Sequence, residues 1–323
     1  MKDEIIYNNT IYRNYDPTRT TSLRNAFARD MRRRFKELMQ IIRIAIVERD
    51  CFGLIHRVTT HQMTPPFESA FAFARSAVKV EEFMQWLQQQ VDLGLLTIQQ
   101  FQQIGSGVET VWTNMYVQDS YKRGVIRARA EMIAAGMNIP SIEASGGIDV
   151  VMSTPFHMDR VGLLYSRVYS DLKGITNAME SIISRILAQG MIDGDGALLL
   201  ARKIVAAIDG TNLGTLGITD RLGRFIPAEV RAEMLARTEL IRAFHLATIQ
   251  EYRNWKVLNI QVQGEWKTAG DDRVCDRCAS LDGKLFTLDE IEPMIPLHPM
   301  CRCIALPYIK ELEKYYEKWN KEE

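Results

Sequence analysis

The stretch Cys275-Asp276-Arg277-Cys278, followed further along by His298-Pro299-Met300-Cys301-Arg302-Cys303, decides how the C-terminal part of this chain folds. Apart from Cys51, it holds every cysteine of the protein. Thiolate and imidazole groups at such spacing are the ligands of a tetrahedral zinc site. The candidate ligands are Cys275, Cys278, His298, Cys301 and Cys303. Because such a site takes four ligands, the spacing leaves open which of the five bind.

The predicted zinc ion is structural rather than catalytic. A site closed by four protein ligands has no open position at which a water molecule could be activated. The segment that carries the ligands is short and poor in apolar side chains, so a bound metal would replace the hydrophobic core that it lacks. Zinc is therefore the expected cofactor, and its structural role is to hold this short segment together.

Disulfide bonds are the alternative use of these cysteines. The chain begins Met1-Lys2-Asp3-Glu4, with acidic residues where a signal peptide has its basic region and with no apolar run behind them. In the reducing cytoplasm that this start implies, thiols stay free, which favours metal ligands. Cys51 stands apart from the cluster and is expected to be a small buried hydrophobic side chain.

The sequence gives little support for an enzyme. Nucleases that combine zinc-binding cysteines with an active histidine need a second histidine to activate water, and this segment contains only His298. Neither a G-x-x-x-x-G-K-[ST] phosphate loop nor a G-x-S-x-G nucleophile turn occurs in the sequence. We therefore expect no catalytic residues, and a metal-dependent hydrolase is the remotest function considered.

Outside the cysteine segment, the hydrophobic pattern is that of α-helices. Between Leu23 and Ile46, apolar residues recur every three or four positions and define one helical face. After Trp255 the residues alternate between apolar and polar, as in a half-buried strand. Helices are predicted over about residues 21–46, 81–94, 98–104, 108–136, 161–186, 197–208 and 228–255, and strands over about 260–266, 285–288 and 304–306.

The expected fold class is mainly α-helical (α+β). Helical N-terminal and central regions precede a small C-terminal β-containing module stapled by zinc. The predicted domains are a helical N-terminal domain with a basic first helix (1–140), a linker (141–160), a second helical part (161–257), the cysteine and histidine module (258–309) and a charged C-terminal helix (310–323).

Length and composition are those of an ordinary globular protein. The chain has 323 residues, of which 46% are hydrophobic and 25% charged, enough for about two domains with a sizeable core. Its formal net charge is zero. The overall charge therefore does not indicate a nucleic-acid partner. No apolar run approaches the roughly 18–20 residues that span a bilayer, and we expect no membrane partner.

Charge is nevertheless concentrated on the first predicted helix. Arg32, Arg33 and Arg34 are consecutive, and could contact phosphates or an acidic protein surface. The simpler interpretation is a solvated helix face. Lys122, Arg123, Arg127 and Arg129 form a second basic group with the same two interpretations.

Several motifs together resemble a known family. Ala236-Arg237-Thr238-Glu239 lies on the helix that leads to Trp266-Lys267-Thr268, which is followed by Asp271, the two cysteine pairs and His298. The order A-R-T-E, W-x-T, D-x-x-C-x-x-C, x-G-x-x-F and H-P-x-C-R-C is similar to that of the phage Mu protein F-like minor head proteins, also called head morphogenesis proteins. The resemblance covers about residues 160–308.

The resemblance implies a minor capsid protein of a tailed phage or prophage. Such proteins associate with the portal vertex, enter during procapsid assembly and act in DNA packaging or ejection. The implied partners are the portal protein and capsid or scaffold proteins, with packaged DNA as a further candidate. The implied location is the virion, in the capsid interior or at the portal vertex, and the host cytoplasm during assembly.

The family pattern also assigns a structural role to individual residues. Arg237, Thr238 and Glu239 are expected to fix their helix against the module, with an arginine–carboxylate pair to Asp271 or Asp272. Trp266 and Asp271 belong to the same structural motif. The alternative function is a DNA-binding protein inside the capsid that uses the basic first helix.

Overall fold

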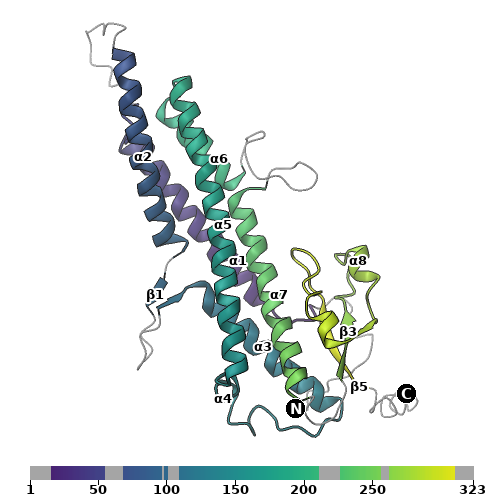
Figure 1. Ribbon diagram of the computed structural model, residues 1–323. Helices are drawn as coiled ribbons and strands as arrows, with labels where there is room; N and C mark the ends of the chain where they lie inside the picture. Colours follow the sequence, from purple (N-terminus) through teal and green to yellow (C-terminus); the bar gives the residue numbers. More distant parts are fainter. Residues whose placement is uncertain are drawn as a thin grey trace. The chain divides into compact units, whose positions relative to one another are not determined.

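The computed structural model describes residues 16–54, 68–96, 98–100, 109–210, 226–255 and 262–309. Its helices are α1 (Thr21–Arg43), continued by a π-helical turn (Ile44–Glu48), α2 (Glu68–Gly94), α3 (Thr113–Ala134), α4 (Ile148–Met152), α5 (Pro155–Asp193), α6 (Ala197–Asp209), α7 (Ala228–Asn254), α8 (Asp276–Ala279) and α9 (Leu288–Ile291). Its strands are β1 (Ile98–Gln100), β2 (Glu109–Val111), β3 (Val262–Lys267), β4 (Leu285–Phe286) and β5 (Ile304–Ile309) (Figure 1). The predicted fold class, mainly helical with a small C-terminal β module, is confirmed.

The chain forms two compact units, each built from separated stretches. The first unit comprises Met1–Phe27, Thr113–Val168 and Met234–Glu323, and the second comprises Ala28–Trp112 and Tyr169–Glu233. The predicted domains are contiguous ranges, whereas helices α5 and α7 each contribute residues to both units. The cysteine segment belongs to the first unit.

A three-stranded antiparallel sheet in the order β4-β3-β5 supports that segment. Strand β3 pairs with β5 along its whole length, from Val262 opposite Ile309 to Lys267 opposite Ile304. Burial alternates along β3 as its sequence predicts, and Trp266 is fully buried. The sheet thereby presents one apolar face to the helices of the unit.

The short helix α9 lies against β3 and is fixed at its start. The Thr287 hydroxyl accepts the backbone N–H of Glu290, and the Glu290 carboxylate accepts the backbone N–H of Thr287 at 2.9 Å, which is a capping box. Gly264 on β3 allows close packing, because a Cβ there would lie 3.0 Å from Cγ2 of Ile291. Helix α9 is thus anchored immediately before the loop that carries His298.

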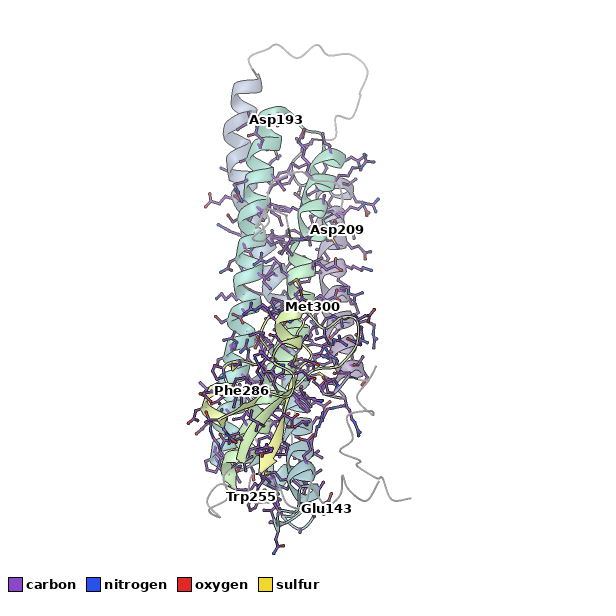
Figure 2. The ribbon with its side chains drawn as sticks, turned by 90° about the vertical axis from the view of Figure 1, so that its right-hand side faces the viewer. Glu143, Asp193, Asp209, Trp255, Phe286 and Met300 are labelled. Atoms are coloured by element: carbon purple, nitrogen blue, oxygen red, sulfur yellow. The ribbon has the colours of Figure 1, made fainter. Side chains whose placement is uncertain are left out.

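The cysteines are part of a hydrophobic core in the first unit. Three of them are buried beside residues of α3, α7 and the sheet, and Trp255 and Phe286 pack against the same cluster (Figure 2). The buried members of this core are Ala128, Met132, Ala135, Met137, Ile139, Ile241, Ile249, Tyr252, Val262, Trp266, Cys278, Leu288, Ile291, Ile295, Cys301, Cys303, Ala305 and Ile309. The ligand segment therefore has more apolar support than its own sequence predicts.

In the second unit, the predicted apolar face of the first helix is buried. Met31, Phe35, Leu38, Ile42 and Ile46 are at most 3% exposed. The part of α5 in this unit repeats the pattern through Leu172, Ile175, Met179, Ile182, Ile183 and Ile186. The helical periodicity of the sequence thus marks the buried faces in this unit as well.

The structure differs from the sequence predictions in several elements. The helix predicted at 108–136 is wrong at its start, because Glu109–Val111 is strand β2 and α3 begins at Thr113. The helix predicted at 81–94 begins earlier, as α2 at Glu68. The helix predicted at 98–104 is wrong at its start: Ile98–Gln100 is strand β1, paired antiparallel with β2, and residues 101–108 lie outside the described residues. So short a stretch has weak local preference, and its pairing partner decides its conformation. The predicted linker contains α4 and the start of α5, and the predicted C-terminal helix lies outside the described residues.

Candidate metal centre

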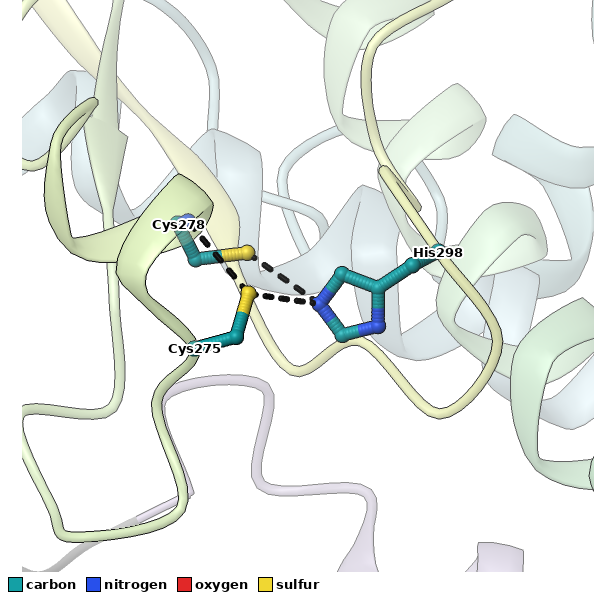
Figure 3. A group of neighbouring side chains, drawn as sticks. All are labelled: Cys275, Cys278 and His298. Carbon is teal, nitrogen blue, oxygen red and sulfur yellow. Dashed lines mark hydrogen bonds between the residues drawn. The ribbon is translucent and has the colours of Figure 1, made fainter. Parts of the chain in front are cut away.

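The turn at the start of α8 brings Cys275 and Cys278 together. Cys275 is the N-cap residue of α8, and its Sγ accepts the backbone N–H of Cys278 at 3.5 Å. This bond closes the C-x-x-C turn and holds both sulfur atoms on one side of it (Figure 3). The pKa of Cys275 lies below its usual value, mainly because its sulfur accepts the hydrogen bond from the Cys278 backbone N–H.

His298 faces these two sulfur atoms from the opposite loop (Figure 3). Its Nε2 lies 3.3 Å from Sγ of Cys275 and 3.3 Å from Sγ of Cys278. Its Nδ1 lies 2.8 Å from the carbonyl oxygen of Pro299, to which it donates. In the neutral ring, this leaves the lone pair on Nε2, the atom that faces the cysteines, as in a metal-bound histidine.

Cys301 and Cys303 complete the cluster and share Cys278 with the first group. The ligand atoms of Cys275, Cys278 and His298 all lie within 4.8 Å of one another, and so do those of Cys278, Cys301 and Cys303. Sγ of Cys301 is 4.0 Å from Sγ of Cys278. The structure therefore brings together all five residues that the sequence singles out.

The pKa values of the two cysteines of the C-R-C pair are shifted in opposite directions. A hydrogen bond from the Cys303 thiol is the largest cause that lowers the pKa of Cys301, and the same bond raises the pKa of Cys303. These opposite directions favour Cys301 over Cys303 as the thiolate of the pair. Burial, followed by the charge of Cys301, raises the pKa of Cys278 to about 12.

The donor set fits zinc. Two sulfur atoms that each lie about 2.3 Å from a zinc ion at the tetrahedral angle are roughly 3.8 Å apart, close to the 4.0 Å between Cys278 and Cys301. All four cysteines of the cluster are free thiols, as metal ligands require. Cys51 is also free, but it is exposed, so its predicted burial is wrong.

Asp271 and Arg302 hold the cysteine loop from outside. Nη1 of Arg302, the residue between Cys301 and Cys303, donates to Oδ2 of Asp271 at 2.7 Å, and Nη2 donates to Oδ1. This bidentate pair has planar, directional geometry. The pKa of Asp271 lies well below its usual range, mainly because its carboxylate accepts hydrogen bonds from Arg302.

The sequence prediction pairs Arg237 with Asp271 or Asp272, and the described contacts give Asp271 other arginines. Arg302 and Arg273 bind the Asp271 carboxylate, whereas Nη1 of Arg237 donates to Oδ1 of Asn25 at 2.9 Å. Arg302, the arginine of the C-R-C pair, binds Asp271 with two N–H groups. The order of motifs along the chain does not predict this pairing.

Thr238 and Glu239 occupy separate positions on α7. The Thr238 Oγ1 accepts the backbone N–H of Met300 at 3.0 Å, so this residue joins the helix to the ligand loop. The buried Glu239 carboxylate accepts hydrogen bonds from Arg167 and Arg242, each at 3.1 Å. The A-R-T-E helix contacts the module, and Thr238 is the motif residue that bonds to the ligand loop.

The consecutive arginines of α1 have partners inside the second unit. Nε of Arg32 lies 2.8 Å from Oε2 of Glu233, and Arg33 pairs with Asp30 and Glu37 on its own helix. Nη1 of Arg34 donates to the carbonyl of Gly94 at 2.8 Å, and its guanidinium lies 4.1 Å from the ring centroid of Trp112. Arg34 is thus a packing residue rather than a solvated charge.

A buried polar network in the first unit has no counterpart in the sequence predictions. Nε of Arg129 donates to Oε1 of the fully buried Glu251 at 2.6 Å. Oε2 of Glu251 lies 3.4 Å from Nε2 of His157, whose Nδ1 lies 2.9 Å from the Tyr121 hydroxyl. Arg129, predicted in a basic surface group, is one of the buried charges of the unit.

A sequence signal for this network exists. Arg129 follows Val125 by four residues on the apolar face of α3, and Glu251 follows Ala247 by four on the apolar face of α7. A charged residue at an apolar position of a helix face either interrupts that face or is buried in an ion pair. His245, fully buried on α7 with a pKa lowered by burial to about 4, carries the same signal.

Fold and site define a mostly helical protein with a small sheet module built around a cluster of metal-ligand residues. Residues 181–306, which include the A-R-T-E helix and the whole cluster, match the family model described as phage Mu protein F like protein. Over this segment the chain is similar to the phage Mu protein F-like proteins, and the match supports the resemblance drawn from its motifs. The family is one of structural proteins, and suggests a role in phage head morphogenesis and association with the virion.

No curated protein and no solved structure matches the chain. Among the helices that the structure describes, none is both long and apolar enough to cross a membrane.

Proposed function

We propose that this chain is a minor capsid protein of a tailed phage or prophage that binds near the portal vertex. Its proposed partners are the portal protein and capsid or scaffold proteins, and its proposed role lies in procapsid assembly and in DNA packaging or ejection. The observation that carries this proposal is the family match over residues 181–306, which spans the motif helix and the cysteine cluster together.

We further propose that the cluster holds one structural zinc ion. Cys275, Cys278, His298 and Cys301 would be its ligands, with the Cys303 thiol as a hydrogen-bond donor to Cys301. When bound, the metal would supply four coordinate bonds between the α8 turn and the His298–Cys303 loop, and no open position for water. The protein would supply the orientation, through the Pro299 carbonyl and the Asp271–Arg302 pair.

Elemental analysis of the purified protein tests the metal proposal. About one zinc per chain is expected, because one four-ligand set is present. Replacing Cys275 and Cys278 together by serine should abolish it. The matched control is Cys51→Ser, which removes an exposed cysteine outside the cluster and should leave the zinc content unchanged. A wild-type protein without metal and with disulfide bonds would contradict the proposal.

Binding to the portal tests the assembly proposal. The full-length chain, mixed with the purified portal oligomer of the same phage in the absence of DNA, should co-sediment with it. Imaging of procapsids should place the protein at the portal vertex. A chain that fails to bind the portal and is absent from purified particles would contradict the proposal. The Cys275→Ser/Cys278→Ser variant then shows whether portal binding requires the metal. The Cys51→Ser variant, which keeps the cluster, is its control.

The DNA-binding alternative predicts a different result. Phosphate contacts release counterions, so DNA binding through Arg32, Arg33 and Arg34 would weaken steeply with salt. The partners of these arginines within the second unit disfavour that function, because DNA would have to displace Glu233 and the Trp112 ring. Salt-dependent DNA binding that is lost in an Arg32→Ala/Arg33→Ala variant would support the DNA-binding function.

A further inference from the structure

The loop that carries two of the proposed ligands turns sharply at Met300. This residue has a φ of 63°, in the left-handed region that side chains other than glycine rarely occupy. The backbone N–H of Cys301 donates to the carbonyl of His298 at 3.1 Å across the turn. Because Met300 lies between His298 and Cys301, its conformation decides whether both side chains face Cys275 and Cys278.

A side chain from α7 fixes this turn. Oγ1 of Thr238 lies 3.0 Å from the backbone nitrogen of Met300 (labelled in Figure 2). The hydroxyl also lies 2.6 Å from the carbonyl oxygen of Met234, one helical turn earlier. A hydroxyl has one proton and two lone pairs, so it donates to Met234 and accepts from Met300. The long helix thereby holds a single N–H group of the strained turn.

We infer that Thr238 is a positioning residue for the metal centre. By accepting the Met300 N–H, it keeps the His298–Cys301 turn in the ligand-ready conformation before the metal arrives. A site that is already in place binds its ligand without the cost of ordering the loop. This inference rests on the proposed zinc site and assigns to the threonine of the A-R-T-E motif a role in metal affinity.

The neighbouring motif residues are occupied elsewhere. Arg237 donates to Asn25, and Glu239 accepts from Arg167 and Arg242. Thr238 bonds instead to the segment between His298 and Cys301, at the backbone N–H of Met300. The effect on the metal should therefore follow the threonine hydroxyl and not the charge of the motif.

Helix α7 offers a matched control. Thr248 makes the same bond to the carbonyl one turn earlier, that of Phe244, at 3.0 Å, and is likewise a threonine in the helix interior. Thr238→Val removes the hydroxyl that accepts from Met300 at nearly constant volume. Thr238→Ser keeps it. Thr248→Val makes the same chemical change without removing the acceptor at the loop.

The test measures the zinc affinity of the full-length protein by competition with a chromophoric chelator. A spectrum of the cobalt-loaded protein and far-ultraviolet circular dichroism accompany it. Thr238→Val should bind zinc about 10–100-fold more weakly, the range for outer-shell partners of metal ligands. Thr238→Ser and Thr248→Val should bind like the wild type. At saturation, the cobalt spectrum of Thr238→Val should match that of the wild type, because the ligands are unchanged.

Each alternative result has a separate meaning. Equal affinity of Thr238→Val and wild type overturns the positioning role, and so does an equal loss in Thr248→Val, which would indicate general destabilisation of α7. A wild type that takes up neither zinc nor cobalt overturns the metal centre itself. The failure of the inference is therefore distinct from the failure of the proposed site.

Discussion

At the residue scale, the cluster assigns different roles to cysteines of one short segment. Cys278 and Cys301 are buried, with sulfur atoms 4.0 Å apart, and the pKa of Cys301 is lowered while that of Cys303 is raised. Arg302, which lies between Cys301 and Cys303 in the sequence, binds Asp271. We propose four of these five residues as ligands and Cys303 as a hydrogen-bond donor to Cys301.

The first prediction separates Cys301 from Cys303. Cys303→Ser should keep the metal, with affinity reduced by at most about 10–100-fold, because serine still offers a hydrogen-bond donor to the Cys301 thiolate. Cys301→Ser should lower the affinity by more than about 100-fold, because it removes a ligand. Zinc stoichiometry and chelator competition on the two proteins provide the measurement. The reverse order would make Cys303 the ligand.

The second prediction concerns the buried Glu251. Burial raises its pKa, but hydrogen bonds from His157, Trp255 and Arg129 outweigh burial and lower it below the usual value. Glu251→Gln leaves Arg129 buried without its charge partner and should cost about 3–5 kcal/mol at pH 7. Denaturant unfolding of wild type and variant provides the comparison.

The pH dependence of that difference follows from the sign of the shift. A carboxyl with a lowered pKa contributes stability above its unfolded pKa of about 4.3, and loses it as the pH falls towards the folded value. The gap in unfolding free energy between wild type and Glu251→Gln should therefore narrow below about pH 4. Loss of metal in acid affects both proteins and largely cancels in the difference. A gap that is constant with pH would show that Glu251 is not ionised in the fold.

At the scale of elements, the close approach of α3 and α7 governs the first unit. A Cβ on Gly124 would lie 2.4 Å from the carbonyl oxygen of Phe244 and 2.7 Å from Cβ of Ala247. Contacts below 3.0 Å with backbone atoms cannot be relieved by a side-chain rotation, so the two helices would have to move apart. The position of α7 in turn places Thr238, His245 and Glu251 against their partners.

The third prediction tests this approach with two glycine substitutions. Gly124→Ala should lower the unfolding free energy by about 1–3 kcal/mol through overpacking. Gly162→Ala, on α5, is the control: a Cβ there meets nothing within 4 Å, and alanine should stabilise the helix by about 0.5–1 kcal/mol. Thermal unfolding should shift in opposite directions for the two proteins. A shift in the same direction would contradict the packing argument.

At the scale of the whole molecule, the proposed metal acts on one of the two units. All candidate ligands lie in the first unit, together with Thr238, Asp271 and Arg302. The buried apolar faces of α1 and α6 in the second unit are far from the ligands in sequence. Removal of the metal should therefore affect the two units unequally.

The fourth prediction is the effect of a chelator. If free zinc exceeds the dissociation constant by about 1,000-fold, its removal costs about 4 kcal/mol of stability. We expect a lower thermal midpoint and early proteolytic cleavage within 262–309, with fragments from 169–209 persisting longer. Mass spectrometry of timed digests locates the cuts. Identical cleavage with and without the chelator would contradict a structural metal in the module.

The sequence by itself determined the helices, the chemistry of the cluster and the family, because periodicity, ligand type and motif order are properties of neighbouring residues. Tertiary structure decided the partners: Asp271 with Arg302, Arg129 with Glu251, and Thr238 with Met300. It also made Ile98–Gln100 a strand. The physical reason is that a periodic pattern shows which face is buried, whereas the partner of a buried hydrogen-bonding group depends on which distant segment packs there.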